Sequence, residues 1–206
     1  MKLSLLACSP LQPYLSRLLD NCPNQVDVTY LPQEKLCAQE QLFTAIKEYI
    51  DGVRDSDGII LTTGVCGMET FALQAGEVPL IIPRVHNCIS LILGNADHYR
   101  AMFEKYSGNL AWYLPSYPEI LFCGAKEDCQ CLAYLADTQL NIPDSSLSAR
   151  VAAAAKQLDF IQVESDSSLL ARLVYGKWCS DDILVTPPHG AVTASFDRRL
   201  ITHFDL

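Results

Sequence analysis

Short apolar runs alternate with longer amphipathic stretches in the first part of the chain. Residues 2–7 form an apolar run of strand length, and residues 11–19 repeat apolar side chains at helical spacing. Residues 26–31 alternate between apolar and polar side chains, as in a strand. Residues 39–53 place four apolar side chains on one helical face: Leu42, Ile46, Ile50 and Val53. The pattern therefore predicts two successive strand–helix units.

The same alternation continues to residue 106. Apolar runs predict strands over 58–63 and 79–82, and amphipathic spacing predicts helices over 68–75, 88–93 and 96–106. Strands that alternate with helices indicate a parallel sheet with right-handed crossovers. The expected fold class is α/β, with an open, mainly parallel sheet flanked by helices.

The second half of the chain has a less regular pattern. It predicts strands over 110–114, 120–122, 160–163 and 183–186, and helices over 130–136, 147–158 and 167–175. A turn with two prolines falls at residues 115–118, and residues 141–144 are the one plausible linker. We expect a single α/β domain over residues 1–206, with a change of lobe near residues 116–145.

Composition narrows the class of protein. Half of the residues are hydrophobic and the net charge is −9, so we expect a globular chain without a nucleic-acid or anionic-membrane partner. No apolar run approaches the roughly 20 residues that cross a bilayer. The start, MKLSLLACSPLQPYLS, resembles a weak export signal, but its apolar run ends at Cys8 and an amphipathic pattern follows. We therefore interpret it as the first strand and expect a cytoplasmic protein.

Nine cysteines are many for such a chain, and an odd number cannot all pair as disulfides. Thiol chemistry or metal ligation is therefore an alternative to a disulfide framework. The simplest interpretation is that most of these cysteines are small buried side chains.

Four candidate ligands follow predicted strands. Cys8 follows the first strand, Cys66 follows the third, and His86 and Cys88 follow the fourth. Ligands of open α/β sheets bind outside the carboxyl ends of the strands. If these strands are neighbours, the four side chains converge on one edge. Three thiolates and an imidazole suit zinc, iron or an iron–sulfur cluster rather than magnesium or calcium.

Other interpretations of these residues remain open. Cys66 or Cys88 at a helix N-terminus would have a depressed pKa, and His86 could then act as the base of a metal-free thiol enzyme. The cysteines could also serve only as small residues in close packing. Arg84, at the same edge, is a candidate for binding a substrate carboxylate or phosphate, although a surface ion pair is the commoner role.

Five further residues are weaker candidates. His189 follows Pro187-Pro188 and could reach the same edge as an additional ligand, but an exposed loop histidine is the more common case. Glu69 could act as a general base or simply favour a helix N-terminus. Cys123, Cys129 and Cys131 match no ligand motif, and the latter two would face different sides of the predicted helix.

Several motifs together resemble an uncharacterised domain family of anaerobic bacteria and archaea. They are Ala7-Cys8, the Gly-x-Cys-Gly of residues 64–67, the Pro-Arg-x-His-x-Cys-Ile of residues 83–89, Leu93-Gly94, and the tail WCSDDILVTPPHG of residues 178–190. The family has aspartate between the histidine and the cysteine, whereas this chain has Asn87. An amide therefore replaces a carboxylate that could orient His86.

The resemblance implies a role in methyl-group or corrinoid metabolism, because members of this family accompany corrinoid-dependent methyl-transfer systems. It implies that Cys8, Cys66, His86 and Cys88 form one metal site for zinc or an iron–sulfur cluster. A corrinoid protein or a methyltransferase is then the expected partner. Zinc would act as a Lewis acid on a thiol substrate, whereas a cluster would indicate redox or dehydration chemistry. A metal-free Cys–His thiol enzyme and a non-catalytic metal or cofactor carrier remain the alternatives.

Overall fold

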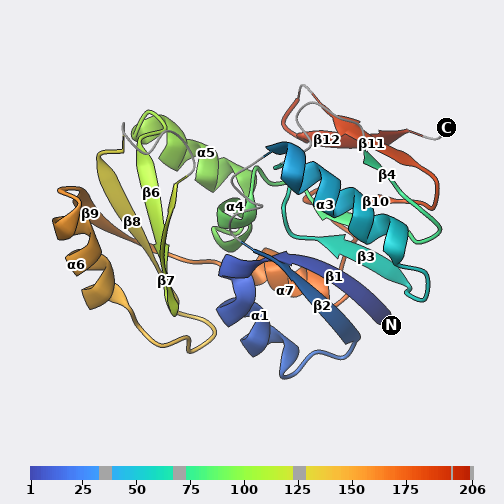
Figure 1. The fold of residues 1–206 in the computed structure, drawn as a ribbon, viewed down its shortest axis with the longest axis horizontal. Helices are drawn as coiled ribbons and strands as arrows, with labels where there is room; N and C mark the ends of the chain where they lie inside the picture. The colour runs from blue at the N-terminus through green and yellow to red at the C-terminus, as the bar shows by residue number, and fades with distance from the viewer. Residues whose placement is uncertain (33–38, 67–72, 123–128, 196, 205–206) are drawn as a thin grey trace.

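The computed structural model describes residues 1–206 except 33–38, 67–72, 123–128, 196 and 205–206. It is an α/β structure with three sheets, as Figure 1 shows. The α/β class expected from the pattern is confirmed, but the strands do not form one sheet.

The largest sheet is built mainly by the first half of the chain. In spatial order its strands are β10 (Ile183–Thr186), β5 (Leu80–Pro83), β3 (Gly58–Leu61), β1 (Lys2–Cys8) and β2 (Gln25–Leu31). β2, β1, β3 and β5 are parallel, whereas β10 is antiparallel to β5. β3 and β5 are buried at every position, because both faces of this sheet are covered.

Helices cover both faces of this sheet. The short 3-10 helix η1 (Ser9–Leu11), α1 (Gln12–Leu19), α4 (Cys88–Ile92) and α7 (Ser168–Val174) contribute to the core on one face. α3 (Gln39–Gly52) covers the other face with Leu42, Ile46 and Ile50. The apolar stripe read from the sequence is thus the buried side of α3.

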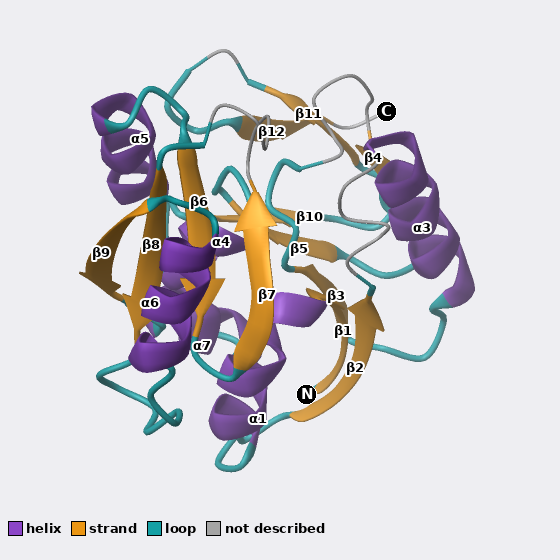
Figure 2. Ribbon diagram, turned by 60° about the vertical axis from the view of Figure 1, so that its left-hand side comes forward, coloured by secondary structure: helices purple, strands orange, loops and turns teal. Residues whose placement is uncertain are grey.

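The second half forms a four-stranded sheet of its own, whose strands lie side by side in Figure 2. Its spatial order is β7 (Tyr117–Phe122), β6 (Leu110–Leu114), β8 (Cys131–Ala136) and β9 (Asp159–Glu164). α6 (Ser146–Ala155) packs on one face, and α5 (Ala96–Lys105) precedes β6. The helix predicted over 130–136 is wrong, because this apolar run is a central strand whose six residues are all buried.

A small third sheet was not predicted. β4 (Leu73–Gln74), β11 (Ala191–Ala194) and β12 (Ile201–Phe204) form an antiparallel sheet in the order β12-β11-β4. Leu73 and Gln74 therefore pair as a strand, although a helix was predicted over 68–75. The earlier part of that predicted helix lies outside the described residues.

One hydrophobic cluster connects the two larger sheets. It contains Leu3 and Leu5 of β1, Trp112 of β6 and Leu135 of β8, together with side chains of α1, α4 and α7. These helices fill the space between the sheets, as Figure 1 shows. Among the described residues, no helix combines the length and the apolar character needed to cross a membrane.

Candidate functional site

The candidate site lies at the carboxyl ends of three adjacent parallel strands. Cys8 is the last residue of β1, Cys66 follows β3, and His86 and Cys88 follow β5. The spatial order β5-β3-β1 makes these strands neighbours, as the convergence of the candidate ligands required. We use the name rim loops for the segments at the ends of these three strands: Cys8 with the residues that follow it, residues 62–66, and residues 84–88.

The rim loops contact one another through their backbones. Gly64 has a φ of +61°, and a Cβ atom there would lie 2.3 Å from the carbonyl oxygen of Val85. The Val65 amide donates to the same oxygen at 3.0 Å. The Cys8 amide donates to Thr62 Oγ1 at 3.0 Å, which joins the end of β1 to the end of β3. A glycine at position 64 is therefore needed for this close approach.

Two of the four candidate ligands are in direct contact. The thiol of Cys88 lies within interaction range of the thiol of Cys8, although Cys8 ends β1 and Cys88 follows β5, the strands on either side of β3. This interaction, followed by burial, raises the pKa of Cys88 well above its ordinary value. The depressed pKa expected for Cys88 at a helix N-terminus is therefore wrong. The neighbouring thiol and burial outweigh the effect of a five-residue helix.

Asn87 fixes the backbone on which Cys88 sits. It is the N-cap of α4, and its Oδ1 accepts a hydrogen bond from the Ser90 amide at 3.0 Å. Cys88 is thus the first residue of the helix. The side chain of Asn87 supplies this cap, which an aspartate could provide equally well.

His86 lies beside the aromatic side chains of α5. Its ring centroid is 5.4 Å from that of Tyr99. Burial, assisted by the positive charge of Arg100 and opposed by Asp97, lowers the pKa of His86. Its Nε2 atom is buried without a hydrogen-bond partner among the described residues. The side chain is therefore neutral at neutral pH and has an unsatisfied ring nitrogen.

Cys66 belongs to a different cluster from the thiol pair. Cys8 and Cys88 pack with the core on the α1 and α7 face, whereas Cys66 packs with the core on the α3 face. Within the described part of the chain, no group of three or more His, Cys, Asp or Glu side chains lies close enough to hold a metal ion. Cys8 and Cys88 thus lie close together as free thiols, and Cys66 and His86 lie on the neighbouring rim loops.

Arg84 also lies at this edge, but backbone carbonyls hold its guanidinium group. Its Nη1 donates to Asp181 O at 2.8 Å and its Nε to Ile201 O at 3.3 Å. These contacts connect β5 to the loop before β10 and to β12. They give Arg84 a structural role, and substrate binding by Arg84 remains a prediction.

His189 does not reach the rim loops. Because β10 is antiparallel to β5, the loop after β10 lies at the opposite edge of the sheet. There the His189 amide donates to Gly76 O at 3.0 Å, and its exposed imidazole lies 3.7 Å from Glu77 Oε2. His189 is thus the exposed loop histidine that was the more common case, and the alternative of an additional ligand is wrong, since the direction of β10 could not be read from its sequence.

The remaining cysteine cluster is also placed differently from the prediction. Cys131 begins strand β8, and the thiol of Cys129 donates to Asn109 O and Cys131 O at 3.6 and 3.5 Å. The helix on which these residues were expected to face different sides does not exist. Cys123 and Glu69 lie outside the described residues.

Two positioning roles at the rim were not predicted from the sequence, that of Thr62 and the N-cap role of Asn87, which was considered only as a neighbour of His86. Thr62 holds the Cys8 amide, and Asn87 caps α4. The asparagine directly before an apolar helical run was a detectable N-cap signal. Thr62 had no such signal, because its partner is 54 residues away in the chain.

The fold and the rim together define an α/β protein with a thiol pair at the carboxyl edge of its largest sheet. A family model described as a protein of unknown function, DUF1638, matches residues 37–117. The chain is thus similar to an uncharacterised family over a segment that contains Cys66, His86 and Cys88 but not Cys8. No curated protein and no solved structure matches the chain.

Proposed function

We propose that the rim loops form a site for a soft metal, either zinc or an iron–sulfur cluster. In this proposal Cys8 and Cys88 are the first two ligands, and Cys66 and His86 complete the set. The observation that carries the proposal is the contact between the thiols of Cys8 and Cys88. Because the chain brings together two thiols from strands separated by β3, the contact requires a specific arrangement of two loops.

The chemical types of the four donor groups fit such a metal. Their positions fit only in part, because two of the four lie close together. Thiolate sulfur and neutral imidazole nitrogen are the donors that zinc and iron–sulfur clusters take. His86 is neutral and its Nε2 lacks a partner among the described residues. Cys66 or His86 has to approach the thiol pair to give a third ligand, since no three candidate ligands in the described ranges are within reach of one ion.

The thiols would respond to a metal by losing their protons. A bound cation favours thiolates, so both Cys8 and Cys88 would ionise on binding despite their buried position. The metal would supply Lewis acidity if it is zinc and an electron-transfer or open-iron centre if it is a cluster. The His86 imidazole would contribute a neutral donor, for which no proton has to be released.

The metabolic role that we propose is in methyl-group or corrinoid metabolism. It rests on the resemblance of the Gly-x-Cys-Gly and Pro-Arg-x-His-x-Cys-Ile motifs to a family that accompanies corrinoid-dependent methyl transfer. A corrinoid protein or a methyltransferase is the partner that such a role requires, and the site would act in catalysis or in carrying the metal. Arg84 would bind a substrate at the same edge through its third guanidinium nitrogen.

The test is metal analysis with visible absorption on full-length protein purified without oxygen. We expect about one zinc, or iron with broad visible absorption, in the wild type. Cys8→Ser and Cys88→Ser should each lose most of the metal, and Cys66→Ser and His86→Gln should weaken its retention against a chelator. Cys22→Ser is the matched control, because Cys22 donates to Val174 O, a contact that a serine can keep.

A second function is favoured by the absence of a third ligand near the thiol pair in the described residues. Cys8 and Cys88 alone could act as a metal-free dithiol, which a mild oxidant would convert to a disulfide. Protein that binds neither zinc nor iron under reducing conditions, yet forms this disulfide reversibly, would refute the metal site and support the dithiol.

A further inference from the structure

We propose that the pocket between α1 and two loops of the second half binds a small organic oxyanion, with Arg17 as the cationic residue that anchors it. The proposal is independent of the metal site, since it uses none of the candidate ligands. It assigns a ligand class to the part of the molecule where the two halves face each other.

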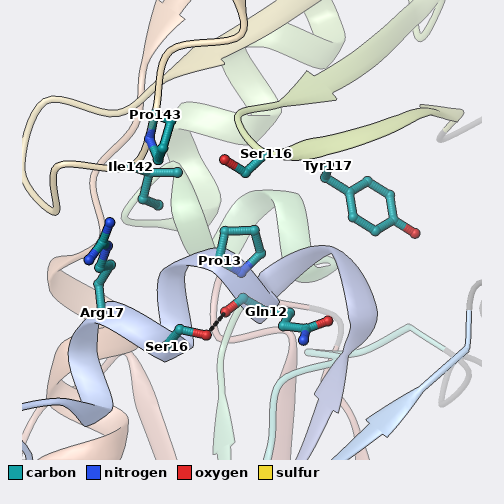
Figure 3. Close-up of a pocket in the computed structure, with 8 residues that line it drawn as sticks. All are labelled: Gln12, Pro13, Ser16, Arg17, Ser116, Tyr117, Ile142 and Pro143. Carbon is teal, nitrogen blue, oxygen red and sulfur yellow. Dashed lines mark hydrogen bonds between the residues drawn. The ribbon is translucent and has the colours of Figure 1, made fainter.

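The pocket has the size of a small-molecule site. Its volume is about 430 Å³, and its lining residues are Gln12, Pro13, Ser16, Arg17, Ser116, Tyr117, Ile142 and Pro143. The first four belong to α1, and the others are the turn residue Ser116, Tyr117 at the start of β7, and two residues of the loop before α6. Figure 3 shows Arg17 near Ile142 at one end and Tyr117 at the other. Ligand sites often occupy this range of volume.

The charge of the pocket is positive in a protein that is otherwise acidic. Arg17 is the one charged residue among the eight lining residues, while the chain as a whole carries a net charge of −9. Within the described ranges no carboxylate forms an ion pair with Arg17. Its Nη2 lies 3.5 Å from Asn141 O, at the outer limit of a hydrogen bond. The guanidinium fork is therefore available to a carboxylate or a phosphate.

The walls opposite α1 are fixed before any ligand arrives. Ser116 and Asn141 have φ angles of +57° and +54°, which cost energy in residues other than glycine. Hydrogen bonds hold both: the Ser116 amide donates to Ser145 Oγ, and the Asp137 carboxylate accepts from the amides that flank Asn141, those of Leu140 and Ile142. A preformed wall lowers the entropy cost of binding.

The other lining groups define the rest of the ligand. Pro13, Ile142 and Pro143 offer an apolar surface, while the hydroxyl group of Ser116 offers a hydrogen bond. The Ser16 hydroxyl donates to Gln12 O at 2.9 Å, so its oxygen is left to accept. The ligand class is therefore a small molecule with one carboxylate or phosphate group attached to a compact apolar body.

The test is NMR titration of full-length ¹⁵N-labelled protein with benzoate, phenyl phosphate and benzamide. We expect saturable shifts at the amides of Ser116 and Tyr117, with a dissociation constant of roughly millimolar order. Tighter binding of benzoate would indicate a carboxylate ligand, and tighter binding of phenyl phosphate would indicate a phosphate ester. Benzamide has the same apolar body without the charge and should bind at least about tenfold more weakly.

Arg17→Met should weaken binding of the preferred anion by about tenfold or more. Arg54→Met is the matched control, because Arg54 is an exposed arginine outside the pocket and should leave binding unchanged. The ¹⁵N spectrum of each variant reports whether it is folded. Equal binding to Arg17→Met and wild type, equal binding of benzamide and benzoate, or no saturable shift with either anion would each overturn the proposal. None of these outcomes bears on the metal content of the rim loops.

Discussion

Gly64 is the residue on which the contact between two rim loops depends. Its φ is +61°, and an added Cβ would lie 2.3 Å from the Val85 carbonyl oxygen, a backbone atom that cannot rotate away. Gly64→Ala should therefore destabilise the protein by about 2 kcal/mol or more, from left-handed strain together with the steric overlap. Urea unfolding followed by circular dichroism measures this free energy.

Gly52→Ala is the control for that substitution. Gly52 is the last residue of α3, and nothing lies within 4 Å of a Cβ atom placed there. The change should be neutral or stabilising by up to about 1 kcal/mol, because alanine favours helix. If the two variants lost the same stability, the close approach of the rim loops would be contradicted.

The sequence predicted the position of a single residue where that position depends only on its neighbours in the chain. The positions of Cys8 at the end of a strand and of Cys66, His86 and Cys88 after strands could be predicted, because apolar runs end where the chain leaves the sheet. The contact of Cys8 with Cys88 could not, since it depends on two loops 80 residues apart in the chain. The carbonyl partners of Arg84 were equally invisible, because the backbone has no residue-specific signal.

At the element scale, α4 is a short helix whose first residue is a candidate ligand. The Asn87 side chain accepts from the Ser90 amide and so holds the turn that presents Cys88. Asn87→Ala should destabilise the protein by about 1 kcal/mol, and Asn87→Asp should cost little, because aspartate is an equally good N-cap. Urea unfolding of both variants checks the prediction.

Asn95 offers a comparison at the start of α5. Its Oδ1 accepts from the His98 amide at 2.8 Å, so Asn95→Ala removes the same kind of cap from a helix that carries no candidate ligand. The two alanine variants should lose similar stability, whereas metal retention should fall only with Asn87→Ala. An equal loss of metal in both would mean that α4 does not position Cys88 specifically.

β8 shows why the type of an element is harder to predict than its existence. The run CLAYLA contains alanine and leucine, which favour helix, and has no alternation of apolar and polar residues. It is a strand because it lies between β6 and β9 with both faces covered, and a buried strand needs no polar side. Periodicity alone does not distinguish such a run from a buried helix.

At the scale of the whole molecule, the pattern of the first half led to one parallel sheet, and the structure has three. The strands after residue 110 pair among themselves rather than extending the first sheet, and β10 returns to β5 in the antiparallel direction. Strand pairing over such distances leaves no periodic signal in the sequence. One hydrophobic cluster connects the two larger sheets, and the single domain expected from the sequence stays a prediction.

The two tryptophans allow that expectation to be tested. Trp112 is buried in β6 of the four-stranded sheet, and Trp178 donates to Leu173 O at the end of α7, beside the five-stranded sheet. Because one hydrophobic cluster contains or contacts both, the halves should unfold together. In Trp112→Phe and in Trp178→Phe, the urea midpoint from fluorescence of the remaining tryptophan should coincide with that variant's midpoint from far-ultraviolet circular dichroism. Separate midpoints within either variant would show that the two halves are independent folding units.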